Sequence, residues 1–237
     1  VQQAVIARGF VTTRVLAGSQ EHTTGKLTLT LVPGRISAIR FDGEGTPTTL
    51  RTAIPARVGD LLNLRDVEQG LENLKRVPTA EADIQITPST APDAQPGDSD
   101  LIVKYAQARH LRASLSLDDS GTEATGRYQA GATLSVDNPF GWNDLFYVNA
   151  SHSIDGHWFN NPDKGTAGQI AHYSVPYVDW LFSTTASRNA YHQNVAGAFQ
   201  GYEYSGKSSN AGVSVSRLLY RGQHPKTIAT VPAFRGS

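Results

Sequence analysis

The segment from Arg127 to Val136 alternates strictly between apolar and polar positions. One set of positions holds Tyr128, two alanines, Leu134 and Val136, and the other holds arginine, glutamine, glycine, threonine and serine. This two-residue period predicts a β-strand with one apolar face. The segment has the length of a tilted strand that crosses a bilayer, and its weakly charged polar face is typical of a barrel lumen.

The same alternation recurs along the chain after His110. It is present in the segments 111–117, 146–151, 170–175, 180–186 and 211–216. With the segment above, we count six or seven such strands, which favours an antiparallel meander that forms part of a membrane β-barrel. A soluble β-sandwich is the alternative, because its strands alternate in the same way.

A helical period precedes this region. Leucine and valine recur on one helical face, at Leu64, Val67, Leu71 and Leu74. Asn63 is a suitable N-cap for this helix, and Pro55 ends a shorter helix predicted over 49–54. Strands are predicted over 36–41, 82–87 and 101–105. The resulting order is β-α-α-β-β.

The first residues show only the end of a similar unit. Residues 1–8 are predicted to be the last turns of a helix that Gly9 terminates. Residues 10–16 and 26–32 follow as two short strands, and the turn-like segment 18–25 joins them into a hairpin.

Composition excludes several classes of protein. The formal net charge is zero, which argues against a nucleic-acid binder, and no run of about 18 apolar residues could form a spanning helix. The chain has no cysteine, so it has no disulfide or thiolate metal site. It also has no methionine, so we expect a mature or truncated product whose export signal lies outside this sequence.

No motif of an enzyme, a cofactor site or a strong metal site is present. The tightest histidine and aspartate group is His152, Asp155 and His157, and it has no third strong ligand nearby. We therefore predict no catalytic residue, no cofactor and no metal. Aromatic residues near the predicted strand ends suggest an interfacial girdle, with ordinary core packing as the alternative: Trp142, Tyr147, Trp158, Tyr177 and Trp180.

Three segments resemble a known family. Gly34–Gly43 resembles the opening strand of a polypeptide-transport-associated (POTRA) domain, and Ala7–Val15 resembles the helix end and second strand of a preceding POTRA domain. Asp137–Asp144 resembles the tight turn between early barrel strands. In this order the segments resemble outer-membrane transporters of two-partner secretion, of the haemolysin-activation and filamentous haemagglutinin secretion type.

The resemblance implies a fold and a domain division. The fold class is α+β POTRA modules of β-α-α-β-β order followed by all-β antiparallel transmembrane strands of a partial barrel. Residues 1–34 would be the C-terminal part of a first POTRA domain, 35–109 a second POTRA domain and 110–237 the N-terminal portion of the barrel. The POTRA part would lie in the periplasm and the barrel in the lipid of the bacterial outer membrane.

The resemblance also implies a partner and a binding site. The partner would be a large secreted exoprotein with an N-terminal secretion domain, held unfolded at an exposed strand edge. The corresponding strand contains Ala82, Asp83, Ile84, Gln85 and Ile86. The alternatives are that this strand only completes its own sheet, that the protein is a BamA-like barrel-assembly factor, or that it is a soluble β-rich binding or adhesin domain.

The sequence departs from the family pattern at both ends. The start of the first POTRA domain is absent, and six or seven strands cannot enclose a polypeptide-wide lumen. After Thr227 the alternation is lost, and Pro232 interrupts the segment Ile228–Ser237. We therefore expect a gene fragment or a frameshift, and a chain that does not secrete by itself.

Overall fold

The structure is a computed structural model that describes residues 1–18, 25, 27–43, 45–154, 163–223 and 225–237. The first half of the described chain contains short helices and strands. They are α1 (Gln2–Ala7), β1 (Arg14–Leu16), β2 (Thr30–Val32), β3 (Ile36–Gly43), α2 (Pro47–Ala53), α3 (Leu64–Leu74), β4 (Ala80–Pro88) and β5 (Ser99–Gln107).

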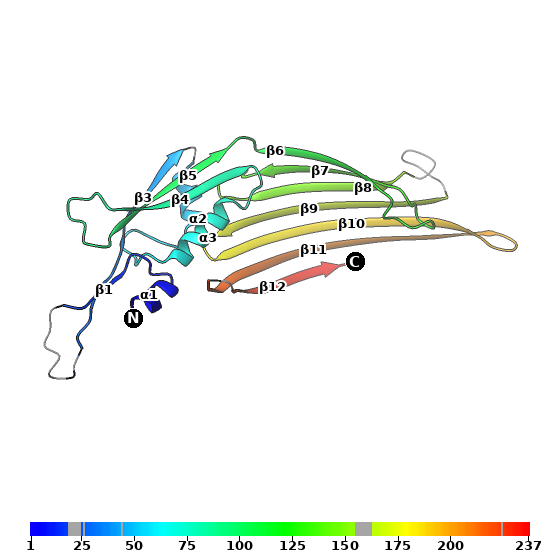
Figure 1. Ribbon diagram of the computed structural model, residues 1–237. Coiled ribbons are helices and arrows are strands. Elements are labelled where there is room, and N and C mark those ends of the chain that lie inside the picture. The colour runs from blue at the N-terminus through cyan, green and yellow to red at the C-terminus, as the bar shows by residue number, and fades with distance from the viewer. Residues whose placement is uncertain (19–24, 26, 44, 155–162, 224) are drawn as a thin grey trace.

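The second half contains longer strands. They are β6 (Leu111–Asp118), β7 (Gln129–Asp137), β8 (Leu145–Ser153), β9 (Lys164–Tyr177), β10 (Trp180–Ala196), β11 (Gly201–Arg221) and β12 (Lys226–Gly236). All seven pair antiparallel with their neighbours in sequence, in the order β12-β11-β10-β9-β8-β7-β6 (Figure 1). The predicted meander is therefore confirmed at seven strands.

The elements β3 to β5 form the predicted β-α-α-β-β unit. Its sheet has the order β3-β5-β4, with β3 parallel and β4 antiparallel to β5. Thr46 caps α2 by accepting the backbone N–H of Thr49, and Asn63 caps α3 by accepting that of Arg65 at 2.9 Å. The start of each helix is thus encoded locally, as the sequence predicted for Asn63.

This unit contains the hydrophobic core. Among the described residues, the cluster of buried hydrophobic side chains that forms this core lies between Ile36 and Tyr105. Leu62, Leu74 and Leu101 have no exposed surface, and each such side chain contributes about 1.5–3 kcal/mol to stability. The α+β unit is therefore stabilised by a core of its own.

The first residues pack against α3. Gly9 lies just after the short helix α1 and has a φ of +97°, which favours glycine. The carbonyl oxygen of Gly9 accepts the N–H of Leu64 at 2.8 Å. The strands β1 and β2 pair over three residues each and are shorter than the sequence predicted. Residues 19–24 of the predicted turn lie outside the described residues.

The seven-stranded sheet has the opposite distribution of polarity from a soluble sheet. Its apolar face is exposed, with Leu115 at 87% and Leu117 at 70% exposure. On the other face, Asp137 and Ser174 are completely buried. An apolar outward face and a polar inner face are what a membrane barrel requires, because lipid covers the first and the lumen lies along the second.

Two predicted boundaries are wrong. The strand that includes the segment Arg127–Val136 begins at Gln129, so Arg127 and Tyr128 precede it. The segment Ile228–Ser237 continues the sheet as β12, with Pro232 opposite Ser214. Among the described residues β12 pairs with a strand on one side only, and a proline without an N–H is tolerated in such a strand.

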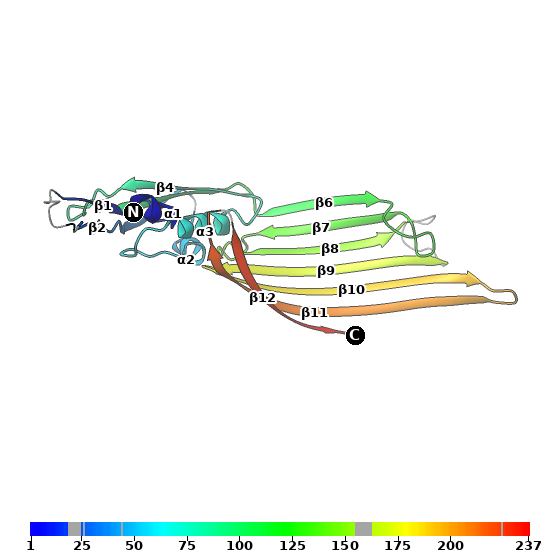
Figure 2. The ribbon, with the colours of Figure 1, turned by 60° about the horizontal axis from the view of Figure 1, so that its bottom comes forward.

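The α+β unit lies at one end of the long strands in both views (Figures 1 and 2). The helices α2 and α3 lie beside the turns that join β7 to β8, β9 to β10 and β11 to β12. The predicted soluble and membrane parts therefore form one continuous structure, and their junction is built from these helices and turns.

Candidate functional site: an open strand edge and the junction with the sheet

The predicted peptide-binding residues Ala82 to Ile86 lie together on β4. This strand pairs with β5 on one side, and on the other side no strand of the described chain pairs with it. Ala82 is buried, and Ile84 and Ile86 pack against the core, whereas Asp83 and Gln85 are exposed. The structure therefore brings the predicted residues to an open sheet edge.

The hydrogen-bond ladder shows which backbone groups of β4 face this edge. The N–H of Ser89 donates to the carbonyl of Asp98 at 3.0 Å, and the N–H of Ala80 points away from β5 to Val77. In an antiparallel pair, hydrogen-bonded and non-bonded positions alternate. Residues 82, 84 and 86 therefore direct their N–H and C=O groups outward, where an added strand would pair with them.

The turn between β7 and β8 binds α2 by hydrogen bonds. The side-chain amide of Asn143 donates to the carbonyl of Thr49 at 2.9 Å and to the hydroxyl of Thr52 at 3.1 Å. The hydroxyl of Thr49 donates to the carbonyl of Gly141 at 2.9 Å. Asn143 is completely buried and has no access to water. These bonds therefore take the place of the hydrogen bonds that its side-chain amide would form with water in the unfolded chain.

The turn between β9 and β10 is held by both helices. Val178 has a φ of +58°, which is strained for a β-branched residue. Its N–H donates to the carbonyl of Thr52 at 2.7 Å, and its carbonyl accepts the side-chain amide of Asn73 at 2.8 Å. The α+β unit therefore supports the strained backbone of this turn.

Charged side chains connect α3 to the turn between β11 and β12. Arg221 donates to Gln69 at 2.8 Å, and Arg221 and Lys226 both form ion pairs with Glu72. Burial by itself would raise the pKa of Glu72, but hydrogen bonds from Lys226 and Arg221 outweigh it and lower that pKa. Arg76, which follows this helix, donates to Ser174 on the polar face of the sheet.

A partly buried ion pair at the start of the sheet lies next to the α+β unit. Two of the three nitrogens of the Arg112 guanidinium, Nε and Nη2, donate to the carboxylate of Asp137, at 2.8 Å and 3.0 Å. The hydroxyl of Thr79, which precedes β4, donates to the same carboxylate at 2.8 Å. Asp137 therefore joins two strands and the segment between α3 and β4.

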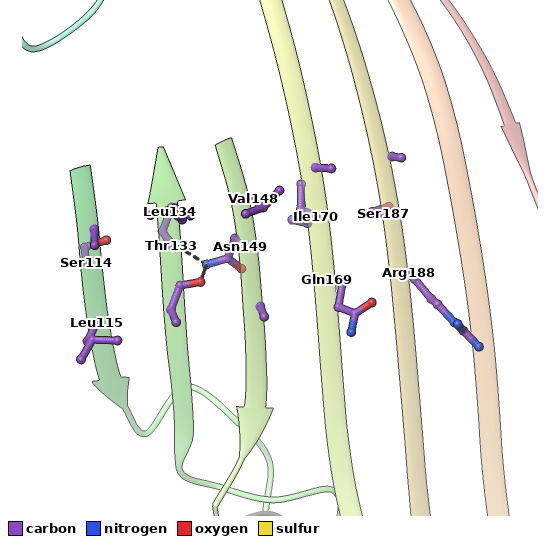
Figure 3. Close-up of a pocket in the computed structure, with 15 residues that line it drawn as sticks. Ser114, Leu115, Thr133, Leu134, Val148, Asn149, Gln169, Ile170, Ser187 and Arg188 are labelled. Carbon is purple, nitrogen blue, oxygen red and sulfur yellow. Dashed lines mark hydrogen bonds between the residues drawn. The ribbon is translucent and has the colours of Figure 1, made fainter. Parts of the chain in front are cut away.

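The polar face of the sheet carries few charges. On this polar face the amide of Asn149 donates to the hydroxyl of Thr133 at 2.8 Å, which Figure 3 marks with a dashed line. Neutral side chains such as Asn149 and Thr133 form hydrogen bonds with each other across neighbouring strands. They therefore do not form a charged binding site for a ligand. On the opposite, apolar face a hollow of about 680 Å³ extends across the middle of β6 to β10, and most of the side chains that line it are alanine, leucine or valine (Figure 3).

The predicted aromatic girdle is present in part. Trp142, Tyr177 and Trp180 are partly exposed near one end of the strands, and Tyr177 pairs with Trp180 across the turn. Tyr147 instead stacks on His172 with ring centroids 5.0 Å apart. These two residues lie on the polar face, so Tyr147 does not belong to the girdle, and Trp158 lies outside the described residues.

Within the described ranges, the structure has no group of three side chains suited to a metal ion. His152 is described, and its Nδ1 lies 2.6 Å from the carbonyl of Ser153. Asp155 and His157 lie outside the described residues.

None of the helices in the part of the chain that the structure describes is long and apolar enough to span a membrane.

Comparison with known proteins explains this arrangement. The profile of the haemolysin secretion/activation protein family ShlB/FhaC/HecB matches residues 97–232, and the POTRA domain profile matches residues 35–88. The chain belongs to this family. Its members are transporters, not enzymes.

Individual relatives agree with this family. The outer membrane transporter CdiB-2 of Burkholderia pseudomallei is 38% identical over 224 residues, which cover 94% of this chain and 37% of the relative. The structure of CdiB from Escherichia coli matches with a TM-score of 0.87 at 28% identity, over 99% of this chain and 42% of that chain. CdiB from Acinetobacter baumannii matches with a TM-score of 0.85 at 31% identity, covering 99% and 43% of the two chains. The chain thus spans well under half the length of these relatives.

Sequence reasoning missed the junction. It identified Asp137–Asp144 as a tight turn and predicted helices over 49–54 and around Asn73, but it did not predict that turns of the sheet bind these helices. A buried asparagine on an otherwise apolar helix face was the available signal, since such a group needs partners. Those partners are distant in sequence, so their identity required the tertiary structure.

Proposed function

We propose that the complete protein is an outer-membrane transporter of two-partner secretion that passes a large exoprotein to the cell surface. The observation that carries this proposal is a sheet with an exposed apolar face, docked directly on a POTRA unit with an open strand edge. The POTRA unit would bind the unfolded substrate in the periplasm, and the complete barrel would form the pore.

The position of α3 supports a transfer of the substrate from the POTRA unit to the barrel. This helix lies against the polar face of the sheet, where Arg76 reaches Ser174 and a hollow of about 310 Å³ separates α3 from β9 to β12. A chain bound at the POTRA unit would therefore be close to the lumen. Membership of the haemolysin secretion/activation family favours secretion over barrel assembly and argues against a soluble adhesin domain.

We also propose the division into 1–34, 35–109 and 110–237 as the end of a first POTRA domain, a second POTRA domain and barrel strands. The separate core between Ile36 and Tyr105 supports the start and the end of the second domain, at residues 35 and 109. The change from buried to exposed apolar side chains after residue 110 supports the last boundary. Separate expression of residues 35–109 and a cooperative unfolding transition would test this division.

Within this function, we propose that residues Ala82 to Ile86 bind the exoprotein by adding it to β4 as a further strand. The outward N–H and C=O groups at 82, 84 and 86 would form the main-chain ladder. Beside this ladder, the exposed side chains of Asp83 and Gln85 form a polar surface that the bound strand would also contact. The side chain of Gln85 donates to that of Asp83 at 3.3 Å. Such pairing accepts many sequences, as transport of a long unfolded chain requires.

Site-specific crosslinking tests the position of the substrate. A photoreactive residue is placed at Gln85, or as a control at exposed Arg40 on β3 at the opposite edge of the same sheet. The full-length protein is then mixed with the N-terminal domain of its exoprotein. We expect crosslinks from position 85 and few from position 40, and equal crosslinking from both would contradict binding at β4.

A matched pair of substitutions tests the main-chain ladder. Ile86→Pro removes the side chain and the outward N–H, whereas Ile86→Ala removes most of the side chain but keeps the N–H. Losing one hydrogen bond costs about 0.5–1.5 kcal/mol, so the proline variant should bind roughly 2–10 times more weakly than the alanine variant. Equal affinities of two folded variants would exclude strand addition at this position.

A further inference from the structure

A groove lies on the outer side of the junction, away from the lumen. It has a volume of about 600 Å³ and lies between α2, the segment after it and the turn between β9 and β10. The residues that matter for its chemistry are Leu50, Arg51, Arg57, Val58 and Tyr177. The groove therefore combines two cations with apolar side chains.

The two arginines are available to bind an anion. Arg51 and Arg57 are exposed, and within the described residues neither guanidinium forms an ion pair or a hydrogen bond. Asp60 also lines the groove, and its carboxylate accepts the backbone N–H of Arg57 at 2.9 Å. The carboxylate thus fixes the turn, and the groove keeps a net positive charge.

The groove is continuous with the lipid-facing surface. Tyr177 is 53% exposed and lies on the same face as Phe182 and Val175, next to Trp180. The guanidinium of Arg217 lies 4.9 Å from the ring centre of Trp180. Aromatic and arginine side chains at a strand end mark the level of lipid headgroups, so the groove opens at that level.

Val58 extends this surface onto the POTRA unit. Its side chain is 62% exposed although it is apolar, and it lies in the segment after α2 that lines the groove. The side chain of Arg35 donates to the carbonyl of Gly59 at 2.7 Å and holds this segment in place. An apolar residue in a fixed exposed position beside two arginines suits a membrane surface.

We propose that this groove binds the phosphate headgroup of an anionic phospholipid from the inner leaflet of the outer membrane. Arg51 and Arg57 pair with the phosphate, whose geometry matches the planar guanidinium, while Val58 and Tyr177 contact the glycerol and upper acyl region. The bound lipid fixes the POTRA unit against the membrane. This proposal requires the sheet to be in the membrane, but it does not require that the protein secretes.

Native mass spectrometry of the full-length protein in detergent micelles tests this site. Phosphatidylglycerol is the anionic probe, phosphatidylcholine is the zwitterionic control and inorganic phosphate is the competitor. The double variant Arg51→Gln/Arg57→Gln is compared with Arg8→Gln/Arg14→Gln, which removes the same charge from exposed residues that do not line the groove. Heat-modifiable migration in gels confirms that each variant has a folded barrel.

We expect the wild type to retain phosphatidylglycerol in preference to phosphatidylcholine. Two arginines near an anionic lipid together contribute about thirtyfold in affinity, so the groove variant should lose about that factor while the control variant changes little. Equal loss in both double variants, unchanged binding in the groove variant, or complete displacement of the lipid by phosphate would overturn the proposal. The crosslinking at β4 is independent of all these outcomes.

Discussion

Asn73 on α3 and Val178 in the turn between β9 and β10 are joined by a hydrogen bond of 2.8 Å across 105 residues of sequence. The same amide nitrogen donates to the carbonyl of Ala53 at 2.7 Å, and the side-chain oxygen accepts Gln69 at 3.1 Å. One buried side chain thus joins both helices of the POTRA unit to the sheet.

Asn73→Ala should therefore weaken the junction more than it weakens the core. It leaves the carbonyls of Ala53 and Val178 without this donor, and each unsatisfied buried group costs about 1–3 kcal/mol. Equilibrium urea unfolding in detergent micelles should show a loss of about 2–3 kcal/mol. Glu81→Ala, at an exposed position on β4, is the control and should change stability by less than about 0.5 kcal/mol.

Val178→Asn should stabilise the protein, because asparagine tolerates a positive φ better than valine does. The left-handed conformation costs an L-residue about 1–2 kcal/mol, and we expect a gain of about 1 kcal/mol in the same measurement. Val178→Ala keeps a Cβ without the polar side chain and should gain less. If alanine and asparagine stabilise equally, backbone strain is not the cause.

Asp137→Asn should destabilise the start of the sheet by about 2 kcal/mol. It removes the charge that pairs with Arg112, and the partial exposure of Arg112 keeps the cost below that of a fully buried pair. Thr79→Ala should cost about 1 kcal/mol. Because both residues share one carboxylate contact, the effects of Thr79→Ala and Asp137→Ala should be less than additive when combined.

Neighbouring substitutions on β6 should separate the two faces of the sheet. Leu115→Arg puts a charge on the lipid-facing side and should cost about 2–4 kcal/mol near the bilayer centre. Ser114→Arg puts the same charge on the polar face and should cost less than about 1 kcal/mol. The folded fraction after insertion into lipid vesicles measures both, and equal losses would contradict the assignment of the faces.

Asp66 should make stability depend on pH. Burial, followed by the charges of Asp179 and Asp60, raises the pKa of Asp66 from 3.8 to about 6 in the folded protein. The folded state then binds more protons than the unfolded state in this window, so stability should fall as the pH rises from about 4 to about 6. Asp66→Asn should remove this part of the pH profile. Asp93→Asn, which changes an exposed loop residue, should leave the profile unchanged.

The sequence predicted the secondary structure well where the pattern is local. The two-residue alternation of β6 to β11 and the helical spacing from Leu64 to Leu74 both depend on near neighbours, and both are confirmed. The alternation failed for β12, because its pairing with β11 outweighs the weak local preference of a segment that contains Pro232. The residues proposed for peptide binding were placed on one strand, but their edge position depended on the order of the sheet.

The sequence by itself thus determined the class of the protein. Both the alternating segments and the POTRA-like order of strands and helices can be recognised from residues that are close together in the chain. Only the tertiary structure decided how the two parts meet. The contacts of Asn73 with Val178, Glu72 with Arg221, and Thr79 with Asp137 join residues that are 58 to 149 positions apart. No local preference encodes such pairs, because the partners meet only in the folded chain. There, buried polar groups such as the side chain of Asn73 have lost their contacts with water and require hydrogen-bond partners within the protein.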